Sequence, residues 1–194
     1  MTTNRLEAFS DGVLAIIITV MVLELRRPEA AEFGALRKLS PVLLSYLLSF
    51  VYVGIYWNNH HHLFHATKRV NGRILWANLH LLFWISLFPF ATAWLGENHI
   101  RPAPTVVYGF VLLMAAIAWL LLQSAIIADE GPHSVLADAV GRDWKGKLSP
   151  VMYLAAIMLA FVSSRTALAL YSVVAVLWLV PDRRIEKALR LQEP

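Results

Sequence analysis

The stretch RLEAFSDGVLAIIITVMVLEL, residues 5–25, decides the fold class because it joins a polar, charged start to a long apolar run. About 20 apolar residues cross the hydrocarbon core of a bilayer as a helix, and this stretch has that length. Arg5, Ser10 and Asp11 stand at its start, and the hydroxyl of Thr19 lies in the middle of the apolar run. A helix that only faces lipid needs neither feature. The stretch therefore predicts a membrane helix with a specific task.

The composition of the whole chain predicts an integral membrane protein. Hydrophobic residues make up 58% of its 194 residues and charged residues 15%, whereas about a quarter of the residues of a soluble domain are charged. The chain has no cysteine, which excludes disulfides, thiolate metal sites and thiol catalysis. The net charge of +4 does not indicate a nucleic-acid partner, because the basic residues lie in short loops between apolar runs.

Six apolar runs predict an all-α polytopic membrane protein with six transmembrane helices, formed by one domain over residues 1–194. The expected spans are about residues 6–25, 42–64, 74–95, 105–128, 150–162 and 166–180. The last two are short, since at 1.5 Å per residue each reaches only about 20–24 Å. We expect them to form a hairpin that turns at residues 163–165, with a re-entrant hairpin as the alternative.

The distribution of basic residues predicts the orientation of the chain. An even number of spans places both termini on one side, and cytoplasmic loops of membrane proteins are enriched in Lys and Arg. With the N-terminus inside, eleven basic residues are cytoplasmic: Arg5, Lys68, Arg69, Arg73, Arg142, Lys145, Lys147, Arg183, Arg184, Lys187 and Arg190. Six are outside: Arg26, Arg27, Arg37, Lys38, Arg101 and Arg165. This excess predicts a multi-pass protein of the cell membrane with both termini cytoplasmic.

This topology places the polar start of the first span at the same depth as polar groups of the second and third spans. Polar groups inside a membrane normally pair with one another. The candidate partners of Asp11 are Asn58, Asn59, His60, His61, His62, Asn78 and His80. Three interpretations are open: a polar clamp between helices, a metal or haem site in which His61 and His65 share a helix face, and a proton relay or pH sensor.

The apolar run of the first span carries a regular stripe. Ile16, Val20 and Leu23 are spaced i, i+4 and i+7, so they share one helix face, with Thr19 beside it. Periodicity alone does not distinguish a face toward lipid, a face packed against other helices and a face toward a pore.

The first span resembles the signature of the transmembrane protein 175 family of potassium channels. The residues that carry this resemblance are Arg5, Phe9, Ser10, Asp11, Ala15, Ile16, Thr19, Leu23, Glu24 and Leu25. Further family-like motifs occur at the end of the second span and in the third, at Trp57 to His61, Asn78, His80, and Leu87 to Phe90. The resemblance covers most of the chain and is strongest in the first three spans.

The resemblance implies a homotetramer in the lipid bilayer, with the four first helices around a central pore for monovalent cations. It implies potassium as the permeant ion and neither a cofactor nor a carbonyl selectivity filter. Matched residue by residue, Ile16 forms the narrowest apolar ring, and Val20 and Leu23 form further rings toward the outside. Thr19 helps to coordinate a partly dehydrated ion. Glu24 either favours cations at the outer mouth or pairs with a neighbouring arginine, Arg26 or Arg27.

The resemblance also implies that the signature residues form a polar network with neighbouring helices. Its expected members on the first helix are Arg5, Phe9, Ser10 and Asp11, and its expected partners on the third span are Trp76, Asn78 and His80.

Two other functions remain open. One is a secondary transporter or proton-coupled carrier that uses the intramembrane Asp and His residues. The other is a metal or haem membrane protein with His61, His65 and His80 as ligands. A receptor-like or purely structural membrane module fits the same hydropathy. No nucleophile with its base and no phosphate-binding glycine loop is recognisable in the sequence, so we do not expect an enzyme.

Overall fold

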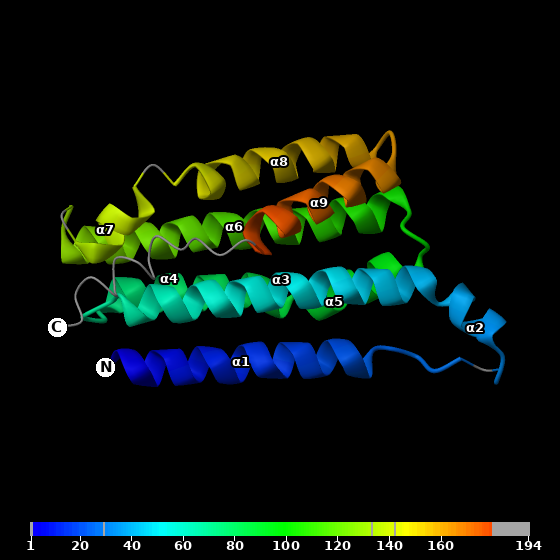
Figure 1. The fold of residues 1–194 in the computed structure, drawn as a ribbon, viewed down its shortest axis with the longest axis horizontal. Coiled ribbons are helices and arrows are strands. Elements are labelled where there is room, and N and C mark those ends of the chain that lie inside the picture. Colours follow the sequence, from blue (N-terminus) through cyan, green and yellow to red (C-terminus); the bar gives the residue numbers. More distant parts are fainter. Residues whose placement is uncertain (1, 29, 133, 142, 180–194) are drawn as a thin grey trace.

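The computed structural model describes residues 2–28, 30–132, 134–141 and 143–179, and all regular structure within them is helical. Figure 1 shows the helices as a bundle with their axes roughly along its length. In chain order they are α1 (Thr3–Leu23), α2 (Phe33–Lys38), α3 (Ser40–His65), α4 (Gly72–Ser86), α5 (Phe88–Glu97), α6 (Pro102–Glu130), α7 (Val135–Val140), α8 (Trp144–Ala160) and α9 (Ser164–Leu179).

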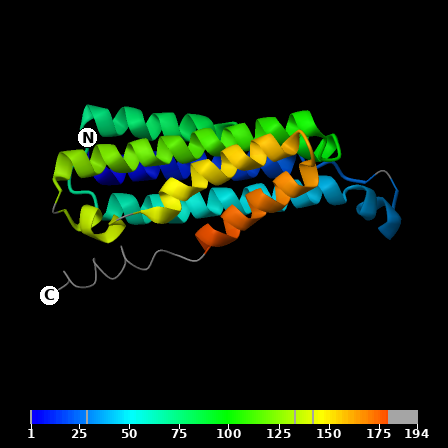
Figure 2. The same cartoon turned by 90° about the horizontal axis from the view of Figure 1, so that it is seen from above.

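The bundle is layered, with α1 on one side and the α8–α9 hairpin on the other (Figure 1). Helix α1 packs against α3, α4 and α5. Helix α6 lies in the middle layer and contacts α4, α5, α8 and α9. Seen from above, the hairpin lies across α6 and α3 (Figure 2). Within the described part of the chain, helix α1 therefore has neighbours on one side only.

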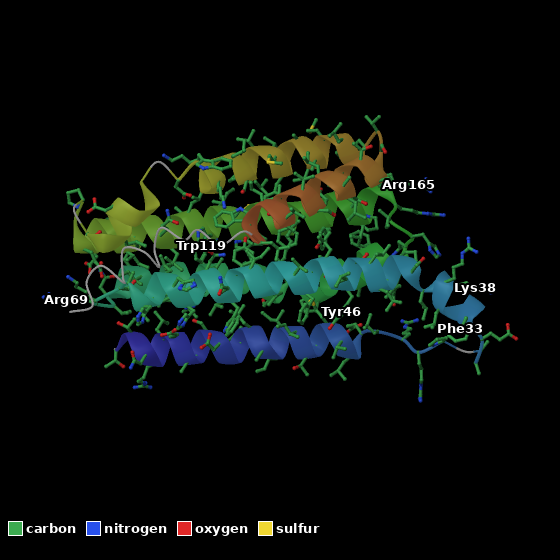
Figure 3. The ribbon with its side chains drawn as sticks, viewed as in Figure 1. Phe33, Lys38, Tyr46, Arg69, Trp119 and Arg165 are labelled. Atoms are coloured by element: carbon green, nitrogen blue, oxygen red, sulfur yellow. The ribbon has the colours of Figure 1, made fainter. Side chains whose placement is uncertain are left out.

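Among the described residues, four helical stretches are long and apolar enough to cross a membrane: Thr3–Leu23, Ser40–His65, Gly72–Glu97 and Pro102–Glu130. They coincide with the first four predicted runs, so the all-helical fold class is confirmed together with four candidate spans. Each of the last three extends past its apolar run, because helical hydrogen bonds continue into the polar residues that flank it. Arg69 lies at one end of the bundle and Lys38 and Arg165 at the opposite end (Figure 3).

The third candidate span is interrupted rather than continuous. Helix α4 ends at Ser86 and α5 begins at Phe88, with Pro89 in its first turn. Proline has no N–H to donate to the preceding turn, and its ring clashes with the carbonyl four residues earlier. Pro89 thus accounts for the break that divides this span into two helices.

The last two helices differ from the predicted ranges in where they begin. Helix α8 starts at Trp144, six residues before Pro150, which lies inside the helix. It starts early because Oδ1 of Asp143 accepts a hydrogen bond from the N–H of Gly146 at 3.1 Å and caps the first turn. With 17 residues, α8 is shorter than the other four stretches, and 16 residues of α9 are described. The end of the last predicted run, residue 180, lies outside the described residues.

Hydroxyl groups satisfy one another in the core between α3, α5, α6 and α9. Thr92 donates to Ser49 at 2.6 Å, and Ser49 is bonded to the hydroxyl of Tyr108 at 3.0 Å. The hydroxyl of Tyr52 donates to the carbonyl of Tyr171 at 2.6 Å. Because lipid offers no hydrogen-bond partners, these contacts fix how the helices that support α1 are arranged.

Candidate pore helix and its polar anchor

Helix α1 has one buried face, which holds it against the rest of the chain. The buried residues recur every three or four positions and are Leu6, Ser10, Leu14, Ile17 and Met21. This spacing puts them on one side of a helix. They pack toward α3, α4 and α5, so they fix the rotation of α1 about its own axis.

The predicted pore-facing residues lie outside the buried face of α1. Ile16 is 64% exposed in the single chain, Val20 37% and Leu23 76%. Thr19 is exposed too, and its hydroxyl donates to the carbonyl of Ala15 at 2.9 Å. Among the described residues, this face does not pack against other helices of its own chain. It therefore faces lipid, a pore or other copies of the protein.

An open groove of about 700 Å³ runs between this face and α5. Ile16 and Val20 line it from α1, and Phe90 and Trp94 line it from α5. Two carboxylates, those of Glu24 and Glu97, also line it. The groove is largely apolar and is open to the surroundings of the single chain.

A chain of hydrogen bonds ties the start of α1 to α4 and α3. The amide nitrogen of Asn78 donates to the hydroxyl of Ser10 at 2.9 Å, and Ser10 donates to the carbonyl of Leu6 at 2.9 Å. On its other side, Oδ1 of Asn78 is 2.8 Å from Nε2 of His60. Ser10 and Asn78 are fully buried, and His60 is 1% exposed. Asn78 therefore bridges three helices.

The donor and the acceptor of each hydrogen bond in this series follow from the bond between Ser10 and the carbonyl of Leu6. A backbone carbonyl only accepts, so the single proton of Ser10 points to Leu6 and the Ser10 oxygen must accept from Asn78. The carbonyl oxygen of Asn78 then faces His60, which must donate through Nε2. Nδ1 of His60 and Oδ1 of Asp11 are buried and have no partner among the described residues.

The other expected members of the signature network lie apart from this chain of bonds. Arg5 and Phe9 are exposed on α1, and Trp76 is 75% exposed. Nε2 of His80 accepts a hydrogen bond from the indole of Trp84, one turn along its own helix, at 2.9 Å. Of the three partners expected on the third span, only Asn78 is hydrogen-bonded to α1.

Sequence reasoning missed a second link between α1 and α3. Oε1 of Glu7 is 2.7 Å from Nδ1 of His61. Glu7 is one of the polar residues that precede the apolar run, and the only available signal was its depth, which matches that of the histidines.

The rings of His61 and His65 stack at 5.9 Å with 16° between their planes. The described residues include no group of three or more His, Cys, Asp or Glu side chains that could hold a metal ion.

At the other end of α1, Arg26 pairs with Glu97 at 3.2 Å and not with Glu24. Both partners are well exposed, with 83% and 44% of their side chains accessible. Of the two arginines considered as partners of Glu24, Arg26 is therefore engaged elsewhere.

Comparisons with known proteins decide the family. The sequence model described as endosomal/lysosomal potassium channel TMEM175 matches residues 5–89. A protein of Chryseobacterium sp. (strain P1-3) named potassium channel is 53% identical over 190 residues, which are 98% of this chain and 99% of the relative. The chain belongs to the TMEM175 family.

The likeness to the TMEM175 family extends to three dimensions. The crystal structure of a lysosomal potassium-selective channel TMEM175 homolog from Chamaesiphon minutus superposes with a TM-score of 0.82 at 31% identity. It covers 93% of this chain and 97% of the other chain. The match therefore includes the C-terminal half, where the sequence motifs are weak.

Vertebrate members of the TMEM175 family match only in part. The endosomal/lysosomal proton channel TMEM175 of Danio rerio is 37% identical over 81 residues, which are 35% of this chain and 16% of that protein. The family model ends at residue 89 and so covers α1, α3 and α4, the helices that carry the signature and the hydrogen bonds of Asn78.

Proposed function

We propose that this protein is a potassium-permeable cation channel whose pore is lined by α1. The main support for this proposal is the outward face of α1, where Ile16, Val20 and Leu23 are exposed. The same helix is anchored at its start by buried hydrogen bonds. A full-length relative at 53% identity is named potassium channel. No enzymatic reaction and no cofactor belong to this function, and K⁺ is the permeant ion.

The pore requires several copies of the chain, and we infer a homotetramer with four α1 helices around its axis. One α1 face cannot enclose an ion path, whereas closed rings of identical subunits do so by symmetry. The groove between α1 and α5 leaves room beside Ile16 and Val20 for a neighbouring copy. In this arrangement the apolar face is covered by protein or lines the pore.

The constriction works by repelling water. Rings of apolar side chains gate a pore by dewetting, so a small change in radius switches conduction. Ile16 forms the narrowest ring, Val20 and Leu23 form wider rings toward the outside, and Thr19 contributes an oxygen near the constriction. Opening is a rotation or tilt of α1 that moves Ile16 away from the axis.

The polar network sets the rotation and depth of α1 in this structure. Ser10 is held by Asn78, and Asn78 by His60, so a rotation of α1 that opens the pore has to break or rearrange these buried hydrogen bonds. This answers why polar residues precede the apolar run. They orient Ile16, which lies six residues further along the helix.

The chain crosses the cell membrane six times, with both termini in the cytoplasm. The four long stretches make the first four crossings, and α8 and α9 make the last two. Arg69 lies at the end assigned to the cytoplasm, and Lys38 and Arg165 lie at the outer end (Figure 3). The excess of basic residues on the cytoplasmic side supports this orientation.

The decisive experiment measures potassium flux into proteoliposomes that contain the wild type or Ile16→Asn. We expect the wild type to conduct and the polar substitution to raise the flux severalfold, because an amide stabilises water in the constriction. Val22→Asn is the matched control, since Val22 is exposed on α1 but lies about 120° round the helix from Ile16. Equal flux in wild type and Ile16→Asn would place the constriction elsewhere.

Proton-coupled transport by a carrier is a second candidate function, favoured by one observation. Asp11 and His60 each bury a polar atom without a partner among the described residues, and buried ionisable groups in membranes often mark proton paths. A pH-sensitive dye inside the same liposomes separates the possibilities. A channel passes potassium without a proton gradient, whereas a proton-coupled carrier moves protons in a fixed ratio to potassium.

A further inference from the structure

Two histidines at the end of α3 are arranged as a pair. His61 and His65 are one helical turn apart, and both are exposed. Their rings are nearly parallel, with 5.9 Å between centroids and 16° between planes. The spacing i, i+4 puts two imidazoles on one helix face, and this is the spacing with which paired histidines bind zinc in helical metal sites.

Glu7 of α1 orients the first ring of this pair. Its Oε1 lies 2.7 Å from Nδ1 of His61. A carboxylate only accepts, so Nδ1 donates, and in the neutral ring Nε2 then keeps a free lone pair. In metal sites, a ligating histidine commonly donates its other N–H to a carboxylate in this way, which fixes the ring and raises its basicity. The Glu7 side chain is only 21% exposed, so water competes weakly for the bond.

We propose that His61 and His65 bind a divalent transition metal ion, such as Zn²⁺ or Ni²⁺, with Glu7 as the outer carboxylate of His61. Imidazole nitrogens suit these ions. The chain supplies two ligands and water completes the shell, because the described residues offer no third His, Cys, Asp or Glu placed to close it. Structural zinc sites use four protein ligands, so this site exchanges its ion with solution.

A bound metal ion affects the hydrogen bond between Glu7 of α1 and His61 of α3. A metal ion on Nε2 makes the Nδ1–H of His61 a stronger donor to Glu7, so the loaded state strengthens the bond between the two helices. The proposal does not depend on ion conduction, since it rests on the geometry of three side chains at one end of the bundle.

The test is a calorimetric titration of the metal-free, full-length protein in detergent with Zn²⁺, using an affinity tag without histidine. We expect saturable binding of one ion per chain. His61→Ala and His65→Ala should each weaken it more than tenfold. His62→Ala is the matched control, because His62 lies in the same turn but about 100° round the helix from His61. His65→Cys should keep binding, since a thiolate also ligates Zn²⁺.

A second readout examines the role of Glu7. Zn²⁺ should raise the midpoint of thermal unfolding of the wild type but not that of His65→Ala. In Glu7→Gln, binding should persist with severalfold lower affinity, because an amide accepts the hydrogen bond but lacks the charge. The proposal is overturned if the wild type shows no saturable binding, if His65→Ala binds as well as the wild type, or if His62→Ala loses binding to the same extent.

Discussion

The hydroxyl of Tyr171 on α9 lies directly against Gly109 on α6, in the space that a Cβ at position 109 would occupy. The same Cβ would come within 2.9 Å of Ile157. We therefore predict that Gly109→Ala destabilises the bundle by about 1–3 kcal/mol, the usual range for an overpacked core. The midpoint of thermal unfolding in detergent, followed by circular dichroism, should fall.

Two further variants separate this contact from a general effect of replacing glycine. Gly54→Ala introduces a Cβ that meets nothing within 4 Å, so it should leave stability unchanged or raise it slightly, because alanine favours a helix. Adding Tyr171→Phe to Gly109→Ala should recover part of the loss, since the overlapping hydroxyl is removed. An unfolding midpoint for Gly109→Ala equal to that of the wild type would contradict the contact.

The two hydrogen bonds of Asn78 predict that Ser10→Ala and Asn78→Ala destabilise the protein to different extents. Ser10→Ala removes one acceptor, whereas Asn78→Ala deprives both Ser10 and the Nε2–H of His60 of a partner and leaves a cavity. Asn78→Ala should therefore lower the free energy of unfolding more than Ser10→Ala. The double variant should lose less than the sum of the two losses, by about 0.6 kcal/mol, the average for hydrogen bonds between membrane helices, and by no more than about 1.7 kcal/mol. Strictly additive losses would show that the two residues do not interact.

The sequence anticipated only part of this bridge. Counting apolar residues placed Ser10 at the depth of Asn78, and the family resemblance gave Asn78, together with Trp76 and His80, as an expected partner of the first helix. The pairing of Glu7 with His61 was not expected, because it depends on the rotation of α1 and α3 about their own axes. Hydropathy carries no information about that rotation. For the same reason, periodicity could not determine which way Ile16 faces.

The ends of the helices were predicted less well than their presence. The apolar run that predicted α8 begins at Pro150, yet the helix begins at Trp144 because Asp143 caps it and also accepts a hydrogen bond from Gln123 of α6 at 3.0 Å. A tertiary contact of this kind leaves no pattern in the local sequence. The break next to Pro89, in contrast, follows from the residue itself.

If the protein is the proposed channel, the carboxylates of Glu24 and Glu97 at its outer end should affect its preference for cations to different extents. Glu97 is paired with Arg26, whereas Glu24 has no ion pair among the described residues. Glu24→Gln should therefore lower the preference for potassium over chloride severalfold, and Glu97→Gln should lower it less. The reversal potential of the protein in a planar bilayer under a potassium chloride gradient measures this preference. An unchanged reversal potential in Glu24→Gln would remove Glu24 from the ion path.

Asn71 performs two tasks at the start of α4, and substitutions can separate them. Its Oδ1 caps the helix by accepting from the N–H of Ile74 at 2.9 Å, and its amide donates to Asp129 of α6 at 2.6 Å. Asn71→Ala loses both bonds and should cost about 1–2 kcal/mol. Asn71→Asp keeps the cap but sets two carboxylates against each other, so its unfolding midpoint should be low in dilute buffer and should rise with salt, which screens the repulsion. Asn71→Ala should show no such rise. If both variants respond equally to salt, the contact with Asp129 does not contribute.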